Sequence, residues 1–282
     1  MWPGLLRAAS FVVLIVEAVM ANGNQWLTVD LQPCSLFSLR SSYATSKGGK
    51  SLLVPTPYAV KMALLDACFR AEEGNRALAL AYRVFDLVKG KPVRFRPPQS
   101  CVVQNTFVRA LQPARGGSEE SGPDSESGDL NVEFSRTIMY REFVFHGGQL
   151  TVALGVDGVA DDGIALLRSL FFHINQLGKR GSFWQVEGVT LRESALPAGF
   201  SVVKAELEAL PAAVAASYRV AQYLDDYGPD LCSDRHGFDR VSTYGAKDIA
   251  FGKHRTISLH LLPYVLARSG RHFSEYRRVE QE

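Results

Sequence analysis

Gly178-Lys179-Arg180-Gly181-Ser182-Phe183-Trp184 follows an amphipathic segment and precedes a stretch of strand character. The periodicity before it predicts a helix that begins at Asp161 or Asp162 and ends at Gly178, because glycine commonly ends helices. Trp184 to Leu191 is predicted to be a strand. The apolar residues that carry the helical spacing are Ile164, Leu167, Phe171, Ile174 and Leu177.

The loop between this helix and strand holds two cations between two glycines, with an aromatic pair directly after. Glycine lets the backbone approach a phosphate chain, and Lys and Arg supply charge for a polyanion. Cations after a helix C-terminus also complement the helix dipole, which explains the charges but not the second glycine or the aromatic pair. Phosphate binding and helix capping therefore both remain open for Lys179 and Arg180.

Working outward, strands are expected at 25–31, 93–96, 101–110, 130–145 and 149–156, and helices at 58–70 and 75–88. Gly147-Gly148 predicts that 130–145 and 149–156 form a hairpin. The resulting order is typical of an α+β fold with a ferredoxin-like, RRM-related βαββαβ core. The C-terminal third is less regular, with helical character at 205–223 despite Pro211 and a late strand at 256–262.

The composition is that of a globular protein of 282 residues, 46% of them hydrophobic, and its formal net charge is +2. The stretch 116–129 holds five acids and no Lys or Arg, and we expect 112–129 to be a mobile loop. Outside this stretch, 31 basic residues face 24 acidic ones. This surplus permits a nucleic-acid partner without requiring one.

The cysteines and histidines show no metal-ligand spacing, and no nucleotide-binding or hydrolase motif occurs. We therefore expect no cofactor, no metal and no catalytic centre, in a reducing, cytoplasmic compartment. Residues 1–21 resemble a short signal peptide, although Met20 could be the true start. In either case we expect 1–23 to lie outside the fold.

Two further groups of residues could bind a nucleic acid. In Tyr140-Arg141-Glu142-Phe143, strand alternation places Tyr140 with Glu142 and Arg141 with Phe143. Arg141 could contact a phosphate while Tyr140 stacks on a base, or an Arg–Glu pair could lie on a solvated face. Arg94 and Arg96 share a strand face that could be a basic ridge or a protected sheet edge.

With these residues assembled, the chain resembles the RAMP superfamily of CRISPR-associated proteins, and above all the Cas-five family of type I surveillance complexes (Cascade). The resemblance covers about residues 25 to 190. It is carried by three segments in a fixed order, namely Val54-Pro55-Thr56-Pro57-Tyr58 before an Ala/Leu-rich helix, Tyr140 to Phe143 after a variable excursion, and Leu177 to Phe183.

The resemblance implies a ferredoxin-like domain at 24–195, with a protruding thumb at about 94–141, and a C-terminal extension at 196–282. It also implies a non-catalytic, RNA-binding role in antiviral defence. The implied partners are the 5′ handle of the guide RNA (crRNA), a Cas-seven-like backbone subunit, the large Cascade subunit and, indirectly, target DNA, with no membrane.

Two alternatives stay open. A minority of the family cuts precursor RNA without metal, and Tyr140, His146 and Lys179 would be the nearest candidates here for such an endoribonuclease. An exported binding protein would follow only if residues 1–21 were a true signal peptide.

The favoured hypothesis requires cations from distant segments to converge in one trough that holds an RNA strand. Tyr140 and Phe183 are the candidates for base stacking. The candidates for phosphate contact are Arg40, Lys47, Lys50, Arg94, Arg96, Arg109, Arg136, Arg141, Lys179 and Arg180.

Overall fold

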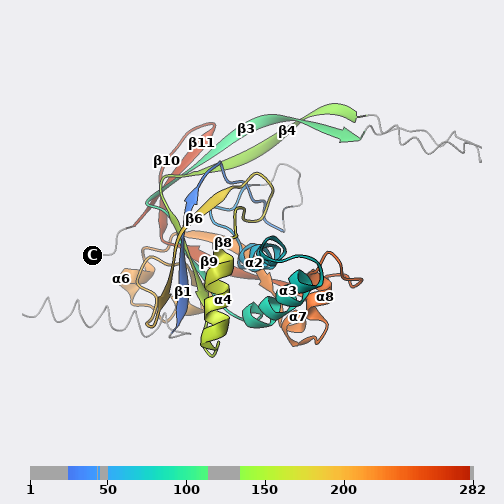
Figure 1. Cartoon of the computed structure of the whole chain (residues 1–282). Coiled ribbons are helices and arrows are strands. Elements are labelled where there is room, and N and C mark those ends of the chain that lie inside the picture. Colours follow the sequence, from blue (N-terminus) through green and yellow to red (C-terminus); the bar gives the residue numbers. More distant parts are fainter. Residues whose placement is uncertain (1–24, 43, 45–49, 114–133, 280–282) are drawn as a thin grey trace, which may run out of the picture.

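The structure is a computed structural model that describes residues 25–42, 44, 50–113 and 134–279. The described residues form three antiparallel sheets with helices packed on them, which confirms the α+β prediction (Figure 1). The expected leader at 1–23 and residues 114–129 of the expected acidic loop lie outside the described residues. Within the described ranges, no helix is both long and apolar enough to cross a bilayer.

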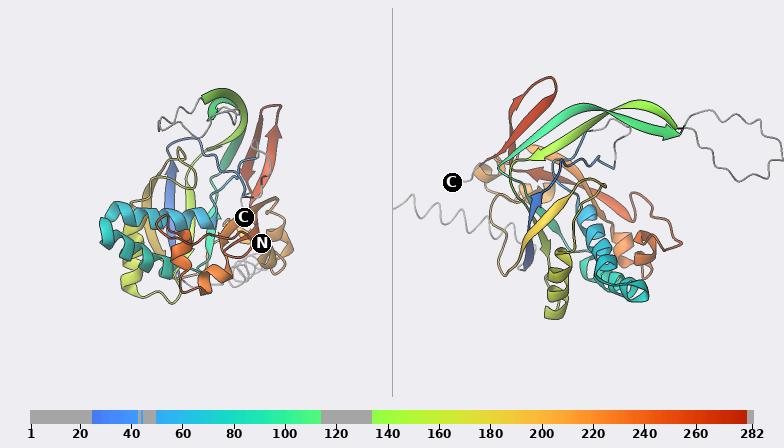
Figure 2. Two further views of the ribbon diagram at one scale, coloured as in Figure 1. Left: turned by 90° about the vertical axis from the view of Figure 1, so that its right-hand side faces the viewer. Right: turned by 45° about the horizontal axis from the view of Figure 1, so that its top comes forward.

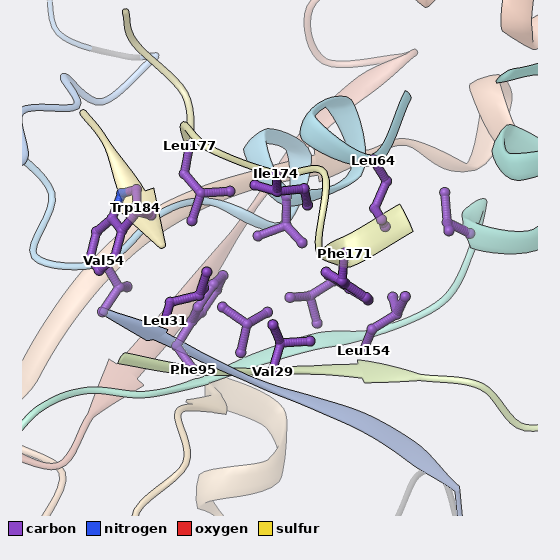
Figure 3. Packing of buried hydrophobic residues seen from close by; sticks show 14 of the residues in the cluster. Val29, Leu31, Val54, Leu64, Phe95, Leu154, Phe171, Ile174, Leu177 and Trp184 are labelled. Atoms are coloured by element: carbon purple, nitrogen blue, oxygen red, sulfur yellow. The ribbon is translucent and has the colours of Figure 1, made fainter. Parts of the chain in front are cut away.

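The first sheet has the order β2-β5-β1-β6, and each neighbouring pair is antiparallel. Helices cover one face of it, where strand residues such as Val29 and Leu154 meet Leu64 and Phe171 (Figure 3). Alternation along the strands directs these apolar side chains toward the helices, while Trp26 and Ala153, on the other face, belong to a smaller buried cluster. The elements are β1 (Trp26–Pro33), β2 (Val93–Arg96), β5 (Leu150–Gly155), β6 (Trp184–Arg192), α2 (Pro57–Ala71), α3 (Gly74–Val88) and α4 (Asp161–Phe171).

Helix α2 begins where the sequence predicts. The Thr56 side chain accepts a hydrogen bond of 3.1 Å from the Ala59 amide, and Pro57 occupies the first helical position. The helix is buried on several sides because it packs between α3 and strand β8 (Val220–Tyr227) as well as above the first sheet.

Replacing Thr56 with Ala is expected to lower the free energy of unfolding by about 1 kcal/mol, because the capping oxygen is lost. Urea unfolding at neutral pH measures the change. Thr56→Ser keeps that oxygen and serves as the matched control. If Thr56→Ala and Thr56→Ser are equally stable, the cap contributes nothing.

The expected hairpin of 130–145 with 149–156 is wrong. Strand β4 (Phe134–His146) pairs with β3 (Ser100–Pro113), whereas β5 pairs with β1 and β2. The chain leaves one sheet and joins another at Gly147–Gly148, because the apolar residues of β5 are buried against the helices of the first sheet.

The second sheet has the order β10-β11-β3-β4, with β10 (Tyr264–Ser269) and β11 (Phe273–Arg278). Figures 1 and 2 show β3 and β4 as a long arm that extends beyond the body of the molecule, beside the shorter β10–β11 hairpin. The C-terminal end of the chain therefore supports the base of the arm, through pairing of β11 with β3.

The predicted end of the helix at Gly178 is also wrong, because α4 ends at Phe171. The backbone then turns more tightly, and the His173 amide bonds the Leu170 carbonyl at 3.0 Å. Ile174 and Leu177 remain buried in this turn. The spacing of these two residues therefore reflects their burial against the core and does not mean that the helix continues to Gly178.

The expected helix at 205–223 is wrong in most of its length. Pro211 separates two short helices, and the residues from Val220 onward form a strand. The strand expected at 256–262 is confirmed as β9 (Arg255–Leu262) in a sheet of order β7-β9-β8. The further elements are β7 (Val202–Val203), α5 (Lys204–Leu207), α6 (Ala212–Ala215), α7 (Pro229–Ser233) and α8 (Gly237–Val241).

Candidate nucleic-acid interface

The loop that holds Lys179 and Arg180 between two glycines is a tight turn. The Ser182 amide donates to the Lys179 carbonyl at 3.1 Å, and Gly181 takes a φ of 91° at the third position. A type II turn requires positive φ at that position, so the second glycine has a conformational reason. Gly178 also has positive φ, at 75°, and it lies against Leu39.

Strand β1 and the segment after it hold this loop in place. Ser35 Oγ donates to the Gly181 carbonyl at 2.7 Å and accepts from the Phe183 amide at 2.8 Å. With the backbone fixed in this way, the side chains of Lys179, Arg180 and Phe183 are exposed. The aromatic and cationic groups predicted for this loop are therefore accessible to a ligand.

Three predicted phosphate-contact residues line one cavity of about 290 Å3. Arg141 comes from β4, Lys179 from the turn before β6, and Arg40 from the segment between β1 and α2. The backbone of Arg40 forms an isolated antiparallel β-bridge with Ser51. Ser38, Met139 and Glu142 also line this cavity, which we call the basic cavity. Tertiary packing thus brings Arg40 together with two cations that lie more than a hundred residues later in the sequence.

The basic cavity carries positive charge that its own carboxylate does not neutralise. Among the described residues, neither Arg141 nor Lys179 has an ion-pair partner, and Arg141 Nε is buried without a hydrogen bond. Burial and, secondarily, the Arg141 charge lower the pKa of Lys179. Glu142 instead accepts from the Ser51 amide at 2.8 Å, and the cross-strand Arg–Glu pair considered above is not found for Glu142 in the part of the chain that the structure describes. An anion bound here would relieve the repulsion.

A second cavity of about 440 Å3 adjoins the basic cavity and shares Arg40 and Lys179 with it. Sequence reasoning missed this larger cavity. Its walls combine helix α2 with Asp225 and Arg255 from the irregular C-terminal third. Of its lining residues, Thr56 and Tyr58 lie in the Val54-to-Tyr58 segment, and Gly178 and Lys179 lie in the glycine-flanked loop, both of which the sequence singled out.

The remaining candidates lie in several places. Lys50 is exposed directly before Ser51 of the basic cavity, and Lys47 lies outside the described residues. Arg109 and Arg136 are exposed farther along the β3–β4 arm. Tyr140 also lies on the arm, with its ring centroid 5.5 Å from that of Phe107.

Arg94 and Arg96 are not brought into the basic cavity. Both lie on β2, at the opposite edge of the first sheet from β6. The Arg94 guanidinium pairs with Glu206, and only 12% of its side chain is exposed. The expected basic ridge on β2 is therefore reduced to Arg96, and the expectation of one trough does not hold for these two residues.

His146, named above as a candidate for RNA cleavage, is buried and its Nε2 lies 2.7 Å from the Leu53 carbonyl oxygen. Its ring packs against Trp184, with centroids 5.3 Å apart. Burial lowers the pKa of His146 to about 4, so the imidazole is neutral at physiological pH. Its surroundings are those of a core residue.

No protein-family model matches the chain. A curated protein from Archaeoglobus fulgidus, "CRISPR-associated protein Cas5", is 26% identical over 135 residues, which are 48% of this chain and 53% of that protein. A solved structure, "Crystal structure of a CRISPR protein from Archaeoglobus fulgidus", is 10% identical with a TM-score of 0.44, covering 91% of this chain and 92% of the other.

The sequence match relates the chain to the CRISPR-associated proteins. More narrowly, about half of the chain is similar to a Cas5 protein, which confirms the resemblance predicted from its motifs. The chain spans about half the length of the curated relative that it matches.

Proposed function

We propose that the chain is a non-catalytic, RNA-binding subunit of a type I CRISPR surveillance complex (Cascade), and that it holds the 5′ handle of the guide RNA. The relation to Cas5 supplies the setting. The single observation that carries the proposal is the basic cavity, where Arg141 and Lys179, which have no ion-pair partner among the described residues, lie beside Arg40.

Such a site suits a phosphate backbone. Arginine binds phosphate through two parallel hydrogen bonds and lysine acts as a point charge. Base pairing supplies sequence recognition in these complexes, so the protein needs to bind the RNA phosphate backbone and to contact only a few bases. Arg180 and Phe183, exposed on the same turn as Lys179, extend this surface.

We further propose that the first sheet is a ferredoxin-like core. The order β2-β5-β1-β6, its antiparallel pairings and the placement of α2–α3 and α4 between its strands all agree with a βαββαβ unit. In this scheme residues 24–195 form the domain, about 94–141 the thumb, which includes most of the β3–β4 arm, and 196–282 the extension. The extension supplies a wall of the larger cavity.

The partners proposed for this subunit are a Cas-seven-like backbone subunit and the large subunit, with target DNA contacted indirectly. The arm supports a protein contact, because it exposes large apolar side chains on one face, where Phe107, Leu111 and Ile138 are each at least 66% exposed. Clusters of exposed apolar groups commonly mark interaction sites.

Replacement of two cationic residues by alanine tests the proposed RNA site. Arg141→Ala combined with Lys179→Ala is expected to weaken binding of a single-stranded RNA that carries the repeat sequence of the same genome by at least about tenfold. The salt dependence should flatten by about two units of slope, because two phosphate contacts are lost. Fluorescence anisotropy at several salt concentrations measures both quantities.

The matched control is Arg76→Ala combined with Arg83→Ala, which removes the same charge from exposed positions on α3. This variant should keep both the affinity and the slope. Equal effects of the two double variants would mean that only net charge matters, and the basic cavity would not be the site.

The runner-up function is metal-independent cleavage of precursor guide RNA. The buried position of His146 gives that reaction no accessible imidazole at this point of the fold. Incubation of the purified protein with repeat RNA in EDTA distinguishes the two, because discrete cleavage products would identify an endoribonuclease.

A further inference from the structure

We propose that the larger cavity, beside the basic cavity, accepts one nucleobase that is turned out of the stack of the bound RNA strand. This inference rests on the proposed function, because the strand must already lie along the basic cavity. It names a base-binding subsite formed by α2, α8 and the start of β9.

The position of the cavity is the first argument. Arg40 and Lys179 line both cavities, so one pair of cations separates an anion-binding space from a partly apolar one. A nucleotide has the same arrangement, with a charged phosphate and a flat aromatic base on either side of the ribose. A phosphate bound at Lys179 would therefore place its own or the next base at the mouth of the larger cavity.

The walls of the cavity are the second argument. Met62, Ala63 and Phe69 of α2 line the cavity together with Phe238 and Val241 of α8. Phe69 is 37% exposed, so its ring is available to a ligand. RNA-binding proteins hold unstacked bases against aromatic rings and guanidinium planes, and an apolar lining that includes an exposed ring suits the face of a base.

The end of the cavity near β8 supplies polar groups. The Arg255 guanidinium lies 4.1 Å from the Tyr58 ring centroid, its Nε bonds the buried Asp225 carboxylate, and its Nη2 donates to Ser42 Oγ at 2.9 Å. Ser242 also lines the cavity. A nucleobase edge can form hydrogen bonds with polar groups of this kind.

The volume fits a small planar ligand. At about 440 Å3 the cavity falls within the range of about 300–1,000 Å3 that is usual for small-molecule sites. The basic cavity alone, at about 290 Å3, is smaller and lined mainly by polar residues. Together the two spaces match one nucleotide that is held by its phosphate and by its base.

A cavity-filling variant tests the subsite. Ala63→Phe places a ring in the larger cavity and leaves the basic cavity intact, and the control Ala79→Phe adds the same ring at an exposed position in α3. The probe is the repeat RNA used above, prepared as a series in which each oligonucleotide lacks one base at a different position. Anisotropy gives the affinity, and thermal melting establishes that both variants are folded.

For the wild-type protein, loss of one particular base is expected to weaken binding about tenfold. Ala63→Phe should bind the intact RNA about tenfold more weakly and should lose the sensitivity to that base, whereas Ala79→Phe should keep both. If Ala63→Phe binds the intact RNA like the wild type, or keeps the wild-type sensitivity to every base, the subsite is wrong while the RNA-binding function stands. If the wild-type protein binds none of the RNAs, both proposals fail.

Discussion

Asp226→Ala is expected to lower the free energy of unfolding by about 3 kcal/mol, the lower end of the usual cost of breaking a buried ion pair, because the Asp226 side chain is itself 27% exposed. Lys61, in the second turn of α2, is only 1% exposed, and its Nζ lies 2.7 Å from Asp226 Oδ1 on β8. Without the carboxylate, the buried ammonium would have no anionic partner. Urea unfolding at pH 7 measures the loss.

Two controls separate charge from packing. Adding Lys61→Met to Asp226→Ala removes the stranded ammonium and should recover most of the lost stability, because an apolar chain of similar length fills the same space. The exposed Asp66–Arg70 pair on the same helix serves as the surface comparison, and Asp66→Ala should cost less than about 1 kcal/mol. A similarly small loss for Asp226→Ala would contradict the prediction.

The two buried histidines, His146 and His260, are together expected to lower the free energy of unfolding by about 4 kcal/mol between pH 7 and pH 5. Burial is the main cause of the lowered pKa of each, to about 4 for His146 and about 3 for His260, where the charge of Arg94 adds to it. The unfolded chain binds protons at these residues below about pH 6.5, while the folded chain does not, so stability falls as pH falls.

Substitution isolates this contribution from that of other groups. Burial raises the pKa of Asp226, which acts in the opposite direction, so the comparison must be made between variants. His146→Gln and His260→Gln should each remove about 2 kcal/mol of the pH-dependent loss, and the exposed His173 supplies the control His173→Gln. If the stability difference between pH 7 and pH 5 is the same in all three variants, neither buried histidine stays neutral in the fold.

Local sequence was sufficient for the elements whose signals are themselves local. Thr56 and Pro57 determine the start of α2 through a hydrogen bond and a dihedral angle within one turn. The alternation in β1 similarly predicts a strand with one buried face. The order of the three quoted motifs was sufficient to indicate the relation to Cas5, which the sequence match confirms.

Only the tertiary structure decided which strands pair and where the helix before Gly178 ends. Gly147–Gly148 is compatible both with a hairpin and with a change of sheet, and the choice depends on where the apolar residues of β5 are buried. Ile174 and Leu177 keep a helical spacing although the helix has ended, because burial against the core imposes the same periodicity on a tight turn.

The candidate site also combines features that the sequence predicts with features that only the folded structure decides. The sequence by itself identified Arg40, Arg141 and Lys179 as cations suited to phosphate, but it also included Arg94, whose charge is taken up by Glu206 more than a hundred residues away. Residue type and local spacing determine which chemistry a side chain can perform. Whether it meets a ligand or a counter-ion depends on long-range packing, because the Coulomb energy depends on distance in the folded chain and not on separation along the sequence.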